Sequence, residues 1–218
     1  MKERKVGFDG RSLAYLDIET TGLDFRIHEI TEISILKPYN DLPEYCPMVL
    51  NGWRAWTAKV YPTRIESADP IALDMNGFNA SVWHREAISI DAALSFISLF
   101  LKDSTIVGHN VFMDMSFISE AFHRAGLEDV ESKYRIDTST LIWQTLCAAG
   151  MRRGSLHNAC RALGISNEGE HTALADVLRT KAVLDRLSHP LSDQTRSRIH
   201  LLEAERASSK NEPPGVVS

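Results

Sequence analysis

The stretch "LAYLDIETTGLD", residues 13–24, decides the fold, because it reads as a buried strand that ends in two acids. Apolar residues fill its first half, and Asp17 and Glu19 follow directly before a Thr-Thr-Gly turn. Residues two apart in a strand point to the same face, so these two carboxylates lie side by side, while Leu16 and Ile18 face the opposite way. Adjacent negative charges near a core repel each other, so a positive charge must lie close by.

Two later segments also place an acid where the apolar pattern predicts a core residue. Asp114 shares a helical stripe with Phe117 and Ile118 in "GHNVFMDMSFISEAFHRAG", and Asp176 shares a helical face with Val183 in "HTALADVLRTKAVLDRL". No Lys or Arg is expected on these inward faces, and we therefore predict that divalent cations balance the charge. A ligand set made only of carboxylate oxygens favours Mg²⁺ or Mn²⁺ over zinc.

Each acid also has a plainer interpretation when it is taken alone. Asp17 and Glu19 can belong to an exposed strand end. Asp114 and Asp176 can be first-turn helix acids that the helix dipole favours, since Thr172 is a good N-cap for the helix that carries Asp176. The metal hypothesis therefore depends on the four acids occurring together and in this order.

The composition is typical of a soluble globular protein. The chain has 218 residues, of which 44% are hydrophobic and 24% charged, and this length fits either one ordinary domain or one domain with an appendage. The longest uncharged apolar stretch, residues 92–101, is about half a membrane span, and the N-terminus has no apolar export signal. We therefore expect a cytoplasmic, intracellular protein that does not bind membranes. The net charge of −5 argues against a nucleic-acid binder, because such domains are usually basic.

Periodicity predicts an α/β layer structure with helices packed on a mixed sheet. Alternating apolar residues predict strands near 12–19, 29–37, 55–61 and 105–109. Helical spacing and capping residues predict helices near 68–78, 89–102, 112–125, 138–149, 155–163 and 172–187. The main domain is predicted to span 10–188, and residues 189–218 to form a C-terminal tail with a short helix near 193–206 and a disordered end.

A histidine accompanies the last of the four acids. His171 lies five residues before Asp176 and just outside the helix that Thr172 caps. On a continuous helix the two residues would face different directions, but outside the helix His171 can lean toward the cleft that holds the acids. An isolated histidine is more often structural than catalytic, so this interpretation depends on the neighbouring acids.

The three motifs resemble those of the DnaQ-like exonucleases, in the DEDDh branch that includes polymerase proofreading subunits and ribonuclease T. The motifs are D-x-E at Asp17 and Glu19, "GHNVFMD" ending in Asp114, and H-x-x-x-x-D at His171 and Asp176. The resemblance covers residues 12–188. The sister branch has Tyr where this chain has Thr172, and the family usually has Phe where this chain has Met113.

The resemblance implies the ribonuclease H-like fold, with a mixed five-stranded sheet flanked by helices. It also implies a metal-dependent 3′–5′ exonuclease that releases 5′-mononucleotides from the 3′ end of single-stranded DNA or RNA, with DNA favoured. Asp17 would bridge two Mg²⁺ or Mn²⁺ ions, Glu19 and Asp176 would complete the site of the attacking water, and Asp114 would support the second ion. His171 would be the general base.

Five further residues are candidate substrate contacts. Thr20, Thr21 and Leu23 follow the acid-bearing strand, and the family's counterpart of Leu23 wedges against the terminal base. His109 and Asn110 end the segment "TIVGHN" and can bind sugar or phosphate. Turn and helix-capping chemistry explains these last two residues equally well.

Two alternatives stay open beside the DNA exonuclease. The chain can be an exoribonuclease that trims RNA 3′ ends, because sugar preference depends on contacts with the 2′-hydroxyl. It can instead be an exonuclease-fold subunit that acts mainly by docking to a polymerase complex, and a second copy of the chain is a further candidate partner. An endonuclease or transposase of the same fold gives no reason for His171 at its spacing.

Overall fold

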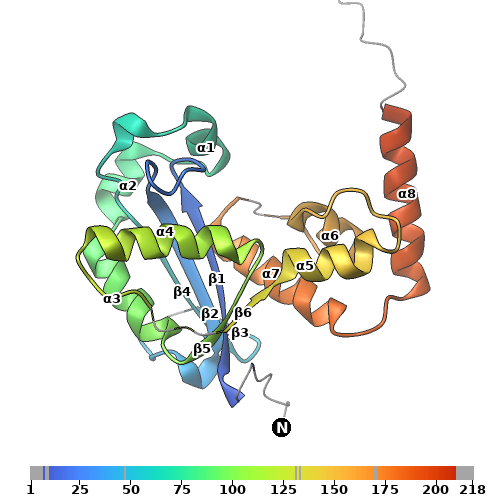
Figure 1. The fold of residues 1–218 in the computed structure, drawn as a ribbon, viewed down its shortest axis with the longest axis horizontal. Coiled ribbons are helices and arrows are strands. Elements are labelled where there is room, and N and C mark those ends of the chain that lie inside the picture. Colours follow the sequence, from blue (N-terminus) through green and yellow to red (C-terminus); the bar gives the residue numbers. More distant parts are fainter. Residues whose placement is uncertain are drawn as a thin grey trace, which may run out of the picture.

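The computed structural model describes residue 7 and residues 10–46, 48–130, 132, 134–168 and 171–209. A six-stranded mixed sheet forms its centre, in the order β3-β4-β2-β1-β5-β6 (Figure 1). The predicted class, a mixed sheet flanked by helices, is confirmed. The predicted count of five strands is wrong by one.

Strand β1, Ser12–Thr20, lies in the middle of the sheet and pairs on both sides. It runs antiparallel to β2 (Ile30–Pro38), which pairs antiparallel with β4 (Trp53–Lys59). On its other edge β1 runs parallel to β5 (Ser104–Gly108), which pairs in parallel with β6 (Tyr134–Asp137). The strands predicted near 12–19, 29–37 and 55–61 therefore form an antiparallel meander, with a short edge strand added to it.

The additional strand is β3, Met48–Leu50, which pairs antiparallel with β4. Asn51 and Gly52 connect the two strands with φ angles of 48° and 84°. Positive φ at both central residues is typical of a type I′ hairpin turn, for which Asn-Gly is the preferred pair. Periodicity assigned this segment to a connection, because three residues are too few to show an alternating pattern.

Helices cover both faces of the sheet (Figure 1). α3 (Ile90–Leu101) and α4 (Val111–Arg124) pack on one face, and α7 (Ala173–Leu187) packs on the other. The alternation along β1 sends Leu16 into the core beneath α3 and α4, and Tyr15 into the core beneath α7. The same alternation directs the acids of β1 toward α7.

A second helical group lies beside the sheet, around the outer part of α7 (Figure 1). It consists of α5 (Thr138–Ile142), a π-helical turn (Trp143–Cys147), α6 (Leu156–Leu163) and α8 (Asp193–Ser209). Ile199 of α8 is fully buried in this core, so α8 packs against its neighbours. The division into a domain at 10–188 and a tail at 189–218 stays a prediction. Residues 210–218, which make up most of the end predicted to be disordered, lie outside the described residues.

The remaining short helices are α1 (Pro70–Met75) and α2 (Ala80–Glu86), with 3-10 turns at Tyr39–Asp41 and Ile65–Ser67. α2 was not predicted, although Asn79 caps it by accepting hydrogen bonds from two backbone N–H groups of its first turn. None of the helices in the described ranges is long and apolar enough to span a lipid bilayer.

Candidate active site

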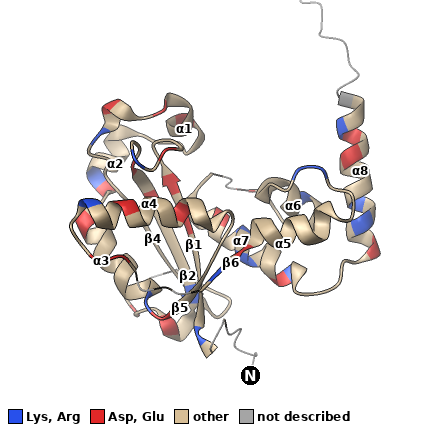
Figure 2. Cartoon of the chain, viewed as in Figure 1, with Lys and Arg blue, Asp and Glu red and all other residues tan. Residues whose placement is uncertain are grey.

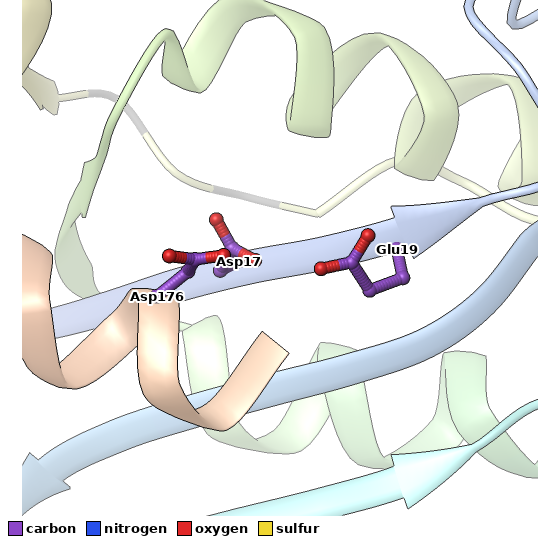
Figure 3. A group of neighbouring side chains, drawn as sticks. All are labelled: Asp17, Glu19 and Asp176. Carbon is purple, nitrogen blue, oxygen red and sulfur yellow. The ribbon is translucent and has the colours of Figure 1, made fainter. Parts of the chain in front are cut away.

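Three carboxylates meet where the end of β1 faces the start of α7. Asp17 and Glu19 lie on β1, and Asp176 lies in the first turn of α7. One oxygen from each of the three lies within 4.8 Å of the others. Figure 3 shows Asp176 reaching from α7 toward Asp17 and Glu19, and Figure 2 shows the acidic positions on β1 in the centre of the sheet. The structure therefore brings together acids that lie almost 160 residues apart in the sequence.

The start of α7 is held by its cap. The Thr172 side chain accepts a hydrogen bond from the backbone N–H of Ala175, and helical geometry then places Asp176 in the first turn. Buried Val177 packs in the core shared with β1, and this packing holds the helix against the sheet. Local capping and packing thus position the Asp176 carboxylate.

Asp114 approaches the site from α4, on the other face of the sheet. The pairing of β1 with β5 runs from Ser12 to Tyr15, and beyond it the backbone N–H of Ile18 donates to Asp114 Oδ1 at 3.1 Å. Asp114 lies outside the three-carboxylate group, but its charge raises the pKa of the Asp17 carboxyl. The structure therefore places the fourth predicted acid beside the other three, on a different helix, α4.

His171 lies next to Asp176. It adopts a left-handed backbone conformation with φ 65°, and its backbone forms a hydrogen bond with the Asp176 carboxylate. A positive charge on the His171 ring lowers the pKa of Asp176, so the two side chains interact electrostatically. The left-handed residue ends the connection from α6 and lets the chain turn into α7 at Thr172.

The carboxyl groups of this site hold their protons unusually tightly. Burial, followed by repulsion from Asp114, Asp176 and Glu19, raises the pKa of Asp17 well above its ordinary value. Burial is also the main cause that raises the pKa of Glu19 to about 8 and that of Asp114 to about 7. Partly buried acids that repel one another are a donor set suited to a divalent cation, which would offset both the desolvation and the repulsion.

The expectation that no Lys or Arg lies on the inward faces is wrong. Arg179 of α7 is only 4% exposed and forms an ion pair with Asp176, one helical turn before it. It also donates from Nη1 to the backbone oxygen of Asn167 at 3.1 Å. The spacing of three residues was a readable signal, because residues three apart share a helix side.

A second missed residue is Glu32 on β2. It lies directly opposite Glu19 in the register of β1 and β2, and it is 7% exposed. Burial raises the pKa of Glu32, and its charge contributes to raising that of Glu19. Finding this pair requires the strand register, which the sequence alone does not give.

The candidate substrate residues divide into turn-forming and exposed side chains. The Thr20 hydroxyl donates to the Gly22 backbone oxygen at 2.7 Å, and the Thr21 hydroxyl accepts from the Glu29 backbone N–H at 2.9 Å. Leu23 is 78% exposed at the tip of the same turn. The two threonines therefore shape the turn, and Leu23 is accessible to a ligand.

His109 and Asn110 lie between β5 and α4. The Nδ1 atom of His109 lies 3.2 Å from the Thr138 hydroxyl, and burial lowers the pKa of the His109 ring. The backbone N–H of Asn110 donates to Asp137 at 2.9 Å, and Asn110 has a left-handed φ of 60° without capping α4 through its side chain. These contacts favour turn chemistry for His109 and for the backbone of Asn110.

Comparisons with known proteins identify the family of this chain. The exonuclease family (RNase T) matches residues 15–184. Ribonuclease T of Shewanella frigidimarina is 29% identical over 197 residues, which cover 81% of this chain and 81% of the relative. The PolC-type DNA polymerase III of Pediococcus pentosaceus is 25% identical over 170 residues, which cover 77% of this chain but 11% of the relative.

Solved structures share the fold. Exonuclease I of E. coli in complex with a dT13 oligonucleotide superposes with a TM-score of 0.64 and 17% identity, and the match covers 92% of this chain and 44% of that chain. The family match extends over most of the chain and contains every candidate catalytic residue. The chain therefore belongs to the exonuclease family and is a 3′–5′ exonuclease of the DnaQ-like group.

Proposed function

We propose that this exonuclease removes 5′-mononucleotides from the 3′ end of single-stranded DNA in a reaction that depends on Mg²⁺ or Mn²⁺. The observation that carries the proposal is the group formed by Asp17, Glu19 and Asp176, whose oxygens lie within 4.8 Å of one another. The bound dT13 of the exonuclease I structure supports a single-stranded DNA substrate. The ribonuclease T relatives support RNA as the alternative substrate.

Asp17, Glu19 and Asp176 would hold the cations, and Asp114 would contribute from the opposite side. When bound, divalent cations would supply charge that polarises the scissile phosphate and lowers the pKa of the attacking water. The four carboxylates are held by β1, α4 and α7, so rigid elements set their positions.

We assign proton removal from the attacking water to His171. Its position beside Asp176 places an imidazole next to the carboxylate group, and a neutral imidazole nitrogen can accept a proton from water. The hydrogen bond between the His171 backbone and the Asp176 carboxylate holds the backbone from which the imidazole ring extends.

Leu23 is the substrate contact that the geometry supports best. It is exposed beyond the turn that Thr20 and Thr21 build, close to the end of β1. An exposed leucine there can pack against the face of the terminal base. His109 and Asn110 remain proposed contacts to sugar or phosphate, although both already have contacts within the protein.

Labelled oligonucleotides test the proposal. DNA and RNA oligomers carrying a label at either the 5′ or the 3′ end are incubated with Mg²⁺ or Mn²⁺, and the products are separated on one gel. Shortening from the 3′ end that requires the cation, and that is lost in Asp17→Asn and His171→Ala, is the expected result. Glu44→Gln, which changes an exposed acid, is the control and retains activity. Activity in Asp17→Asn equal to wild type would falsify the proposal.

Docking to a polymerase is a second candidate function. The PolC-type relatives contain a segment similar to this chain within much longer polymerases. A polymerase, or alternatively a second copy of the chain, is therefore a proposed partner. We also propose an intracellular location for the protein. Size-exclusion chromatography with light scattering, with and without a polymerase subunit, distinguishes a monomer, a homodimer and a complex.

A further inference from the structure

A buried arginine links the carboxylate group to the segment that carries His171. Arg179 projects from α7, and its Nη2 atom pairs with Asp176 Oδ1. Its Nη1 atom donates to the Asn167 backbone oxygen at 3.1 Å. One guanidinium thus contacts a candidate metal ligand and the backbone that precedes His171.

The connection from α6 is fastened at two further points. The Asn167 side chain donates from Nδ2 to the His157 backbone oxygen at 3.2 Å, which ties it to α6. At its other end, the His171 backbone hydrogen-bonds to the Asp176 carboxylate. Arg179 therefore contacts the backbone at Asn167, and its ion-pair partner Asp176 contacts the backbone at His171.

We propose that Arg179 is a positioning residue: it ties the Asn167 backbone to the Asp176 carboxylate, which also contacts the His171 backbone, and so sets the place of the His171 ring. This inference rests on the proposed function, in which His171 acts on the substrate. The planar guanidinium suits the task, because its N–H groups point in different fixed directions. A lysine would keep the charge but would lack this fork.

The alternative is that Arg179 only stabilises the packing of α7. With that role, replacing Arg179 would lower the free energy of unfolding as much as replacing any other buried arginine, with no specific effect at His171. Arg54 provides the matched comparison, because it is also 4% exposed and donates to two backbone oxygens, of Pro43 and Cys46. Arg54 lies on β4, and its described contacts involve no residue of the candidate site.

Amide hydrogen exchange in the metal-free protein measures the positioning directly. In Arg179→Met the backbone N–H of His171 is expected to exchange about tenfold faster or more than in wild type, because its acceptor and its segment are no longer held. In Arg54→Met the exchange at His171 is expected to equal that of wild type. Arg179→Lys is expected to lie between Arg179→Met and wild type, and it replaces Arg179→Met if that variant does not fold.

Activity provides the second readout. Arg179→Met is expected to lower kcat at least tenfold with less than a threefold change in KM, while Arg54→Met leaves both close to wild type. Equal exchange at His171 in wild type and both Arg179 variants would overturn the inference. Faster exchange in a chain whose wild type has no nuclease activity would refute the proposed function and leave the fastening of the segment intact.

Discussion

Glu19→Gln is predicted to stabilise the metal-free protein while abolishing its activity. Glu19 lies beside Asp176 and opposite Glu32, and burial with repulsion from these two acids raises its pKa from 4.5 to about 8. Folding therefore holds an acid in a place that disfavours its charge. Replacing the carboxyl with a neutral amide of similar shape removes that cost.

The size of the effect follows from the pKa. In the folded state Glu19 keeps its proton until pH 8, whereas in the unfolded state it loses the proton above pH 4.5. Stability is therefore lost as the pH rises from 4.5 to 8, by up to about 3 kcal/mol at pH 7. Glu19 is half-buried, and screening by water reduces this to about 1–2 kcal/mol. For a chain of this size, that corresponds to a Tm higher by about 3–6 °C.

Thermal unfolding in the presence of EDTA checks the prediction. The Tm of Glu19→Gln is expected to exceed that of wild type at pH 7.5 and to approach it at pH 5, because both proteins then hold a neutral side chain. Saturating Mn²⁺ is expected to raise the Tm of wild type more than that of the variant, because the variant has lost a ligand. Exposed Glu44→Gln is the control with no expected shift. A gain that does not depend on pH, or a lower Tm at pH 7.5, would refute the reasoning.

Three further predictions concern single side chains. His171→Ala is expected to lower single-turnover rates about 100-fold or more with little change in substrate affinity, which rapid-quench kinetics and equilibrium binding check separately. Asp114→Asn is expected to retain the hydrogen bond from Ile18 and the metal-free Tm but to lose activity, as circular dichroism and the gel assay show. Leu23→Ala is expected to leave the Tm unchanged, because the side chain is exposed, and to raise KM several-fold on short oligomers.

The site acids could be predicted because their signals are local. Alternation along β1 is enough to pair Asp17 with Glu19, and helical spacing is enough to show that Asp114 and Asp176 occupy inward positions. The caps Thr172 and Ser155 likewise act within one turn, and the helices that they begin occur close to their predicted positions. Features that depend on residues within about ten positions of one another can therefore be predicted from the sequence.

The features that were missed depend on contacts between distant segments. Glu32 meets Glu19 only through the register of two strands, and the burial of Ile199 depends on α6, roughly forty residues earlier. Arg179 was missed for a different reason. The inward face of α7 was expected to carry no Lys or Arg, although the spacing of three residues between Asp176 and Arg179 already placed the two on one side of the helix.

The acidic net charge is compatible with a nucleic-acid substrate, because the charge is unevenly distributed. Residues 1–137 contain 14 Lys and Arg against 21 Asp and Glu, whereas residues 138–218 contain 10 against 8. The acidic excess therefore belongs to the part of the chain that supplies Asp17, Glu19, Glu32 and Asp114, and Figure 2 shows basic positions on α7 and α8. Net charge alone was thus a poor guide to the partner.

The cluster can persist without a cation because the surrounding core holds its strands. Leu16 and Ile33 are fully buried on the face of the sheet opposite the acids, and they keep β1 and β2 paired despite the like charges of Glu19 and Glu32. Arg179 offsets part of the repulsion from within. A site that is formed before the ion arrives needs little rearrangement to bind it. Because the ion binds the folded protein and not the unfolded chain, its binding raises the free energy of unfolding. The metal-free protein should therefore be folded and measurably less stable than the protein with Mn²⁺.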